Sequence, residues 1–160
     1  MSNLKQAIKQ NYVKCAKSPS YFINEFCTIQ HPQRGKIKFK LYPYQYDVLD
    51  EFEKHDYNVV LKSRQLGIST LSAAYALWMM LFHNDKNILC IATSKDTAKN
   101  LVTKVRIMYE GLPNWLKTAI VENNKLSLIF KNGSQIKAIA SNESAGRSEA
   151  LSLLILDEAA

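Results

Sequence analysis

Apolar residues recur along the chain with two different periods, and each period predicts a different kind of element. Recurrence every three to four positions is typical of an amphipathic helix, whereas alternation or a short unbroken apolar run is typical of a strand. The first pattern predicts helices over residues 3–17, 19–28, 44–54, 69–82 and 95–109. The second pattern predicts strands over residues 36–41, 58–61, 87–92, 126–130, 134–138 and 151–156.

The order of these elements indicates the fold class. From residue 58 onward, strand and helix alternate twice, which favours an α/β fold with a parallel sheet and covering helices. Residues 151–156 form the most apolar strand-like run, as expected for a central parallel strand. Asn132-Gly133 separates two strand-like runs and predicts a β-hairpin. The pattern therefore predicts one α/β domain, or part of one.

Composition changes this picture mainly through charge. Hydrophobic residues make up 47% of the 160, enough for a core, and no apolar run approaches the roughly 20 residues that cross a bilayer. Eight of the 21 basic residues but only one of the 14 acidic residues lie within residues 1–40. Such an arm attracts nucleic acid through counterion release, or is a solvated face that aids solubility. We expect a basic helical arm over residues 1–40 and the main domain over residues 41–160.

The segment from Lys62 to Thr70 reads KSRQLGIST and lies between a predicted strand and a predicted helix. The standard phosphate-binding loop is G-x-x-x-x-G-K-[ST], whose backbone N–H groups cradle phosphate and whose hydroxyl binds magnesium. Gly67 fits the second glycine of this pattern, and Ser69 fits the hydroxyl. Ile68, however, stands where the lysine is required, and Lys62 stands at the first glycine.

Two interpretations of this altered loop are open. In the first, the site is inactive and Ile68 only packs. In the second, Lys62 supplies the cation from the other end of the loop, because the loop folds back over the phosphates and a lysine stem is long and flexible. Arg64 is either a surface cation or a group that stabilises charge on a terminal phosphate. The following helix favours an anion at its N-terminus.

Two carboxylates, Asp157 and Glu158, follow the apolar run over residues 151–156. In this position the first carboxylate typically holds magnesium, and the second orients or deprotonates the attacking water. The alternative is an ordinary acidic turn after a strand. The loop upstream favours the catalytic interpretation.

The segment LYPYQ, from Leu41 to Gln45, opens a helix about 20 residues before the loop. A glutamine amide can donate to and accept from adenine, and a tyrosine can stack on it. Alone, this pattern carries little information. Upstream of a phosphate loop, it resembles the adenine-reading glutamine motif of helicase-like ATPases.

Together these segments resemble the N-terminal ATPase region of the large terminase subunit of tailed bacteriophages, in the myophage branch. The most specific parts are RQLG at residues 64–67 and DEAA at residues 157–160. The resemblance implies a P-loop NTPase fold of the RecA-like (ASCE) type, whose parallel sheet is incomplete at the C-terminal end. The matching segments are residues 41–45, 62–70, 91–94, 132–134, 146–148 and 154–160.

The resemblance implies a motor that uses ATP and Mg²⁺ to drive double-stranded viral DNA into a procapsid. Its expected partners are that DNA, the portal protein of the procapsid, the small terminase subunit and further copies of the chain in a ring, without a membrane and in the host cell cytoplasm. The expected catalytic residues are Glu158 and Arg64, the arginine as a finger acting in cis. The expected magnesium ligands are Ser69 and Asp157. The residues expected to bind the nucleotide are Gln45, Lys62, Ser63, Arg64, Gln65, Leu66, Gly67, Ile68, Ser69 and Thr70.

Some departures from the family pattern qualify this expectation. Ile68 replaces the standard lysine, although some family members carry the lysine at the start of the loop, which supports Lys62. Arg147 is a further phosphate-sensing candidate or a surface cation. We expect the chain to be a fragment or truncated copy of a longer gene product, without the family's nuclease domain. The alternatives are a helicase-like DNA translocase and a non-catalytic nucleotide- or DNA-binding module.

Overall fold

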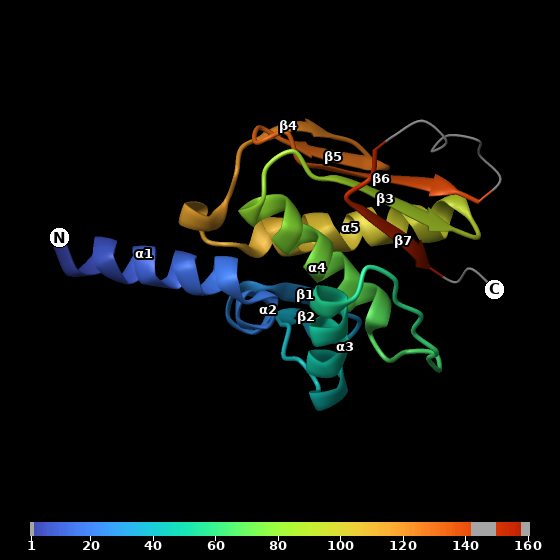
Figure 1. Cartoon of the computed structure of the whole chain (residues 1–160), viewed down its shortest axis with the longest axis horizontal. Helices are drawn as coiled ribbons and strands as arrows, with labels where there is room; N and C mark the ends of the chain where they lie inside the picture. Colours follow the sequence, from blue (N-terminus) through green and yellow to red (C-terminus); the bar gives the residue numbers. More distant parts are fainter. Residues whose placement is uncertain (1, 142–149, 158–160) are drawn as a thin grey trace.

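The computed structural model describes residues 2–141 and 150–157 as an α/β protein with two sheets (Figure 1). The helices are α1 (Ser2–Lys17), α2 (Pro19–Phe26), α3 (Pro43–Lys54), α4 (Ile68–Phe82), α5 (Lys95–Gly111) and the short 3-10 helix η1 (Asn114–Leu116). The strands are β1 (Thr28–His31), β2 (Gly35–Lys38), β3 (Asn87–Ala92), β4 (Ile120–Asn123), β5 (Ser127–Phe130), β6 (Gln135–Ala140) and β7 (Leu153–Asp157).

The main sheet has five strands in the order β4-β5-β6-β3-β7. The strands β6, β3 and β7 run parallel, and Ala92 of β3 lies opposite both Ala140 of β6 and Asp157 of β7. Strand β5 pairs antiparallel with both β4 and β6. A tight turn at Gly133, with φ of +82°, reverses the chain between β5 and β6. The predicted α/β class and the predicted hairpin are therefore confirmed. The sheet is mixed, however, so the expected parallel sheet is found only in part, over β6, β3 and β7.

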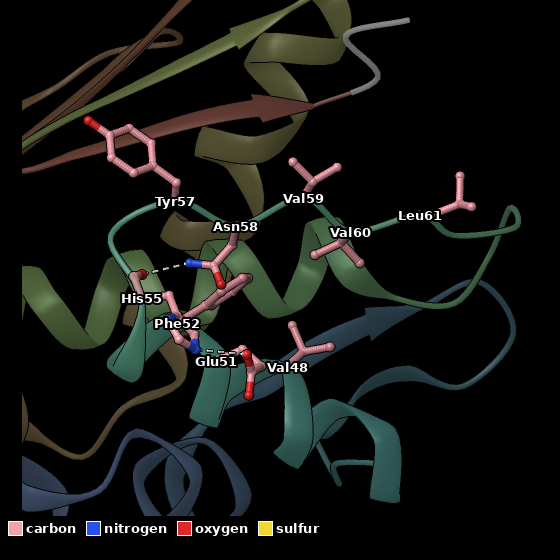
Figure 2. A pocket seen from close by; sticks show the side chains of 9 residues that line it. All are labelled: Val48, Glu51, Phe52, His55, Tyr57, Asn58, Val59, Val60 and Leu61. Carbon is pink, nitrogen blue, oxygen red and sulfur yellow. Dashed lines mark hydrogen bonds and ion pairs between the residues drawn. The ribbon is translucent and has the colours of Figure 1, made fainter.

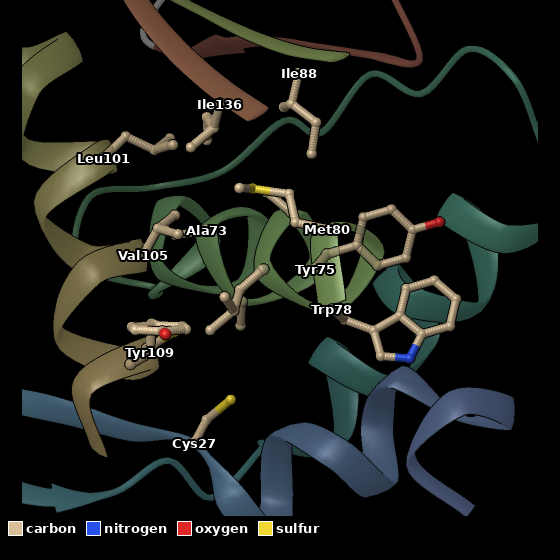
Figure 3. Packing of buried hydrophobic residues seen from close by; sticks show 14 of the residues in the cluster. Cys27, Ala73, Tyr75, Trp78, Met80, Ile88, Leu101, Val105, Tyr109 and Ile136 are labelled. Carbon is tan, nitrogen blue, oxygen red and sulfur yellow. The ribbon is translucent and has the colours of Figure 1, made fainter. Parts of the chain in front are cut away.

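Helices α4 and α5 lie between the main sheet and the N-terminal elements (Figure 1). Ten of the 15 residues of α4 are buried, as expected for a helix that is apolar on all sides. Met80 of α4 points toward Ile88 and Ile136 of the sheet, and Ala73 faces Val105 of α5 (Figure 3). Helix α4 therefore joins the sheet and the N-terminal elements into one hydrophobic core.

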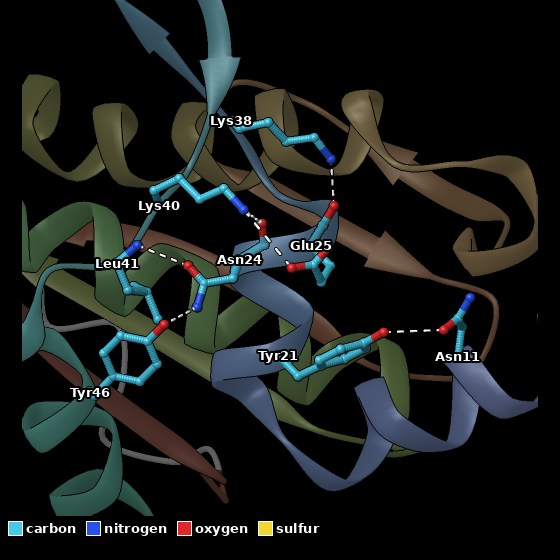
Figure 4. A network of polar contacts seen from close by, with 8 residues as sticks. All are labelled: Asn11, Tyr21, Asn24, Glu25, Lys38, Lys40, Leu41 and Tyr46. Carbon is cyan, nitrogen blue, oxygen red and sulfur yellow. Dashed lines mark hydrogen bonds and ion pairs between the residues drawn. The ribbon is translucent and has the colours of Figure 1, made fainter.

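Polar contacts fix the C-terminal end of α2 (Figure 4). Oδ1 of Asn24 accepts a hydrogen bond from the backbone N–H of Leu41 at 3.0 Å. Lys40 donates from Nζ to the carbonyl oxygen of Asn24 at 3.1 Å, and Lys38 donates to the carbonyl oxygen of Glu25. These cations offset the partial negative charge at the helix terminus. Two lysines of the basic N-terminal arm thus stabilise the fold.

The predicted strand over residues 58–61 is wrong. These residues form neither a helix nor a strand, and Val59 and Leu61 are 99% and 100% exposed. A preference for strand structure reflects how a side chain fits a paired surface, and in the described chain no strand pairs with this segment. The sequence analysis also missed β1 and β4, which are four residues long each.

The other predicted helices and strands are confirmed, with ends shifted by a few residues. In the part that the structure describes, no helix has the length and apolar character that crossing a membrane requires.

Candidate functional site

The N-terminus of α4 meets the C-terminal end of β7 at a single hydrogen bond. Ser69, in the first turn of α4, donates from Oγ to Oδ1 of Asp157 at 2.9 Å. Asp157 is the last residue of β7, and α4 packs against this strand. The fold therefore brings together the two residues that the sequence proposes as magnesium ligands.

Residues 62–67 form the loop that leads into α4. Gln65 and Gly67 both have positive φ angles, of 66° and 71°. Glycine adopts this conformation freely, whereas it is uncommon for glutamine. The first N–H groups of a helix have no partner within the helix, and residues of alternating handedness direct consecutive N–H groups toward a common point. The backbone of this loop is therefore suited to an anion.

Helix α3 holds the loop through two side chains. The hydroxyl of Tyr44 donates to the carbonyl oxygen of Leu66 at 2.8 Å, and Nε2 of Gln45 donates to the same oxygen at 3.2 Å. Oε1 of Gln45 accepts from the backbone N–H of Tyr42 at 3.0 Å, and the residue is only 1% exposed. The Gln45 amide thus contacts protein through both its oxygen and its nitrogen. The contact of Gln45 with adenine stays a prediction.

The remaining loop side chains differ in exposure. Lys62 is half-buried and Arg64 is exposed, so both cations are accessible to a ligand on the loop. Ser63, Gln65 and Leu66 are exposed, and Thr70 is half-buried. Glu158 and Arg147 lie outside the described residues, so their roles stay predictions.

Ile68 occupies the position of the standard lysine, and it packs into the core. Its exposed fraction is 7%, and it belongs to the same hydrophobic cluster as the buried apolar residues of α4. A lysine amine at this position would have to leave that cluster to reach phosphate. Any cation that serves the loop therefore comes from another position.

Cys90 lies on β3, the strand next to Asp157. Burial, and to a smaller degree the charge of Asp157, raises the pKa of the Cys90 thiol to about 12. A thiol is nucleophilic only after it loses its proton. The Cys90 thiol is therefore protonated and weakly nucleophilic near neutral pH.

A pocket of about 460 Å³ lies between α3 and residues 57–61 (Figure 2). Asn58 and Val60 point toward α3, whereas Tyr57, Val59 and Leu61 point away from it. The side chain of Asn58 donates from Nδ2 to the carbonyl oxygen of His55 at 2.8 Å, which holds the segment to the end of α3. The residues that line the pocket are Val48, Glu51, Phe52, His55, Tyr57, Asn58, Val59, Val60 and Leu61. The pocket therefore lies beside the loop over residues 62–67 and does not contain the Ser69–Asp157 pair.

The site offers few protein ligands to a metal. Among the described residues, no group of three or more His, Cys, Asp or Glu side chains is placed to hold an ion. Magnesium needs fewer, because it is commonly bound by one or two carboxylates together with waters and substrate phosphates. The Ser69 hydroxyl and the Asp157 carboxylate are donors of the kind that magnesium prefers. The residues present therefore fit magnesium in company with phosphate oxygens or water.

The fold is similar to that of a solved phage protein, the large terminase of bacteriophage HK97. The TM-score is 0.70 at 21% sequence identity, and the match covers 89% of this chain and 31% of the solved chain. The chain thus spans about a third of the length of that terminase. The chain is therefore an α/β protein with the large-terminase fold.

A family model narrows this class. The model described as "Terminase large subunit, T4likevirus-type, N-terminal" matches residues 59–160. The chain belongs to this family of phage large terminase subunits. The resemblance drawn from the loop and the acidic end is confirmed.

The sequence does not predict the role of the Tyr44 hydroxyl. A tyrosine in this segment is expected only to stack on adenine, whereas in the structure the Tyr44 ring stacks on Tyr42 with centroids 5.8 Å apart. Nothing in the local sequence pattern predicts the contact of the Tyr44 hydroxyl with the loop. A tyrosine next to the glutamine was the one available signal.

Proposed function

We propose that the chain is the nucleotide-binding part of an ATP-driven motor that packages double-stranded viral DNA into a procapsid. The observation that carries the proposal is the Ser69–Asp157 hydrogen bond in a chain of the large-terminase family. In this proposal the fold is a P-loop NTPase of the RecA-like type, and the cofactors are ATP and Mg²⁺.

Groups of the loop, of the start of α4 and of the end of β7 each have a task in the proposed reaction. The N–H groups at the start of α4 bind the phosphates, and Lys62 neutralises their charge from the front of the loop. Ser69 and Asp157 hold the magnesium ion, which offsets negative charge on phosphate oxygens when bound. Arg64 stabilises charge that develops on the terminal phosphate.

Glu158 completes the proposed set as the group that orients or deprotonates the attacking water. It directly follows Asp157, the last residue of β7. In this proposal the two adjacent carboxylates divide the metal and water tasks.

The proposed partners follow from family membership. They are double-stranded viral DNA, the portal protein of the procapsid, the small terminase subunit and other copies of the chain in a ring, all in the host cytoplasm. The basic N-terminal arm supports contact with DNA, because four lysines of α1 are exposed. These are Lys5, Lys9, Lys14 and Lys17.

The test is binding and turnover of ATP by the wild type and by Lys62→Ala, with and without Mg²⁺. We expect Lys62→Ala to weaken Mg·ATP binding by at least about tenfold, because it removes a charge-assisted contact to phosphate. The matched control is Lys125→Ala, which deletes an exposed lysine remote from the loop in sequence and should bind as wild type. Absence of Mg·ATP binding by the wild type would overturn the proposed function. Wild-type affinity in Lys62→Ala would instead remove only the relocated lysine.

A further inference from the structure

The carbonyl oxygen of Leu66 accepts two hydrogen bonds from helix α3. One comes from the Tyr44 hydroxyl at 2.8 Å and the other from Nε2 of Gln45 at 3.2 Å. A carbonyl oxygen has two lone pairs, so the two donors use its full capacity. The direction of this carbonyl is therefore fixed toward α3.

The direction of that carbonyl also sets the direction of an N–H group. The peptide bond between Leu66 and Gly67 is trans, as are all others in the described chain. In a planar trans peptide, C=O and N–H point to opposite sides. Since the Leu66 carbonyl points at α3, the Gly67 N–H points away from α3.

The Gly67 N–H has no competing partner in the described part of the chain. Gly67 is the N-cap of α4, so its N–H precedes the unpaired N–H groups of the first helical turn. Positive φ angles at Gln65 and Gly67 flank Leu66, whose φ is negative, and this alternation directs neighbouring N–H groups to one side. The Gly67 N–H is therefore part of the surface that an anion meets.

Packing of Gln45 against Gly67 reinforces this arrangement. A Cβ atom on Gly67 would lie 3.1 Å from Nε2 of Gln45, closer than most side-chain contacts. Gln45 is itself anchored, because its Oε1 accepts from the backbone N–H of Tyr42 at 3.0 Å. Helix α3 therefore presents a rigid donor to the loop.

We propose that Tyr44 and Gln45 are positioning residues that hold the Leu66–Gly67 peptide in the orientation that aims the Gly67 N–H at a bound phosphate. This inference rests on the proposed nucleotide function and extends it. Gln45 acts through the loop, so its effect does not depend on the base of the nucleotide. Loss of either donor lets the peptide rotate and removes one N–H from the phosphate site.

The test compares two anions that share a phosphate chain and differ in the base. Isothermal titration of the whole chain with Mg·ATP and with Mg·tripolyphosphate gives both affinities. Tyr44→Phe deletes only the hydroxyl and keeps the ring that stacks on Tyr42. Tyr42→Phe is the matched control, because the Tyr42 hydroxyl makes no hydrogen bond among the described residues. Gln45→Met replaces the amide with an unbranched chain of similar length.

We expect Tyr44→Phe and Gln45→Met to weaken both ligands by the same factor, about three- to tenfold for one lost hydrogen bond. Tyr42→Phe should leave both affinities unchanged. A loss confined to Mg·ATP would overturn the inference, because it would make Gln45 a reader of the base. Wild-type affinity of Tyr44→Phe for both ligands would overturn it as well. Because Tyr44 is at the surface, that variant tests the inference even if Gln45→Met fails to fold.

A second readout follows the peptide itself. The chain has only five glycines, so the Gly67 amide can be assigned in a ¹⁵N-labelled sample. We expect Mg·tripolyphosphate to shift this resonance in the wild type and in Tyr42→Phe, and to shift it less in Tyr44→Phe. An equal shift in all three proteins would overturn the positioning role. Absence of any binding by the wild type would instead remove the proposed function on which the inference rests.

Discussion

Ser69 and Asp157 are hydrogen-bonded at 2.9 Å, although they lie 88 positions apart in the sequence. The serine belongs to the first turn of a buried helix, and the aspartate ends a strand whose register with β3 is fixed at Ala92. Rigid elements place functional groups more accurately than loops do. The hydroxyl and the carboxylate are therefore held close together, as the proposed magnesium site requires.

Removal of the serine hydroxyl tests this arrangement. Ser69→Ala should weaken ATP binding about tenfold in the presence of Mg²⁺, because the metal loses one protein ligand. Binding measured in EDTA should not change. Ser72→Ala, which deletes a hydroxyl on the same helix, serves as the control and should match the wild type under both conditions. An equal loss with and without Mg²⁺ would show that Ser69 contacts the nucleotide without a metal.

The position of the missing lysine gives a second prediction. Ile68→Val shortens a buried side chain and should cost about 0.5–1.5 kcal/mol of stability, with ATP binding retained. Ile68→Lys restores the standard motif but places an unpaired charge in the core, and it should cost roughly 3–5 kcal/mol. Thermal unfolding and ATP titration of both variants measure these effects. A stable Ile68→Lys variant that binds ATP more tightly than the wild type would contradict the assignment of Lys62 as the phosphate-binding cation of the loop.

A buried hydrogen bond ties α1 to the core. Trp78 donates from Nε1 to the carbonyl oxygen of Cys15 at 2.8 Å. Trp78→Phe removes this donor and should lower the free energy of unfolding by about 1–3 kcal/mol. Trp115→Phe is the matched control, because within the described residues the Trp115 indole makes no hydrogen bond. Urea titrations should show the smaller loss for Trp115→Phe, and equal losses would assign the whole effect to ring size.

His83 makes stability depend on pH. Burial, followed by the charge of Lys86, lowers the pKa of His83 from its ordinary value of 6.5. The unfolded state therefore binds a proton more readily than the folded state as the pH falls below 6.5. The stabilisation is present above that pH and is lost as the pH falls through the folded-state pKa.

The measurement compares wild type with His83→Gln, which removes the titrating ring. We expect the stability advantage of the wild type to shrink between about pH 7.5 and about pH 5 in urea titrations. Background carboxylates titrate in both proteins and cancel in the difference. A difference that grows in acid would contradict the direction of the pKa shift.

Local signals explain which elements could be predicted from the sequence. Ser18 and Pro19 predict the start of α2. In the structure, Oγ of Ser18 accepts a hydrogen bond from the N–H of Tyr21 at 3.2 Å. Strand β1 carries no alternating pattern and exists because it pairs with β2. The segment 58–61 shows the opposite case, since its strand-like composition finds no partner. In both cases the presence or absence of a pairing strand decides the outcome, and the composition of the segment itself does not reveal that partner.

The candidate site also has parts that the sequence predicts and parts that it does not. The sequence alone predicts that the hydroxyl of Ser69 and the carboxylate of Asp157 lie together, because phosphate and magnesium chemistry requires such groups in known positions. The bond from Tyr44 to Leu66 spans 22 positions and connects a helix to a loop, so it leaves no periodic trace. The same holds for the burial of Gln45.

The unpaired segment before the loop has a practical consequence for the chain in solution. Tyr57, Val59 and Leu61 are 95%, 99% and 100% exposed, and Leu154 and Leu156 are 46% and 57% exposed on the edge strand β7. Bare apolar side chains and open sheet edges attract other polypeptides. Light scattering of a purified sample should therefore rise steeply with concentration, and dilute samples suit titration best.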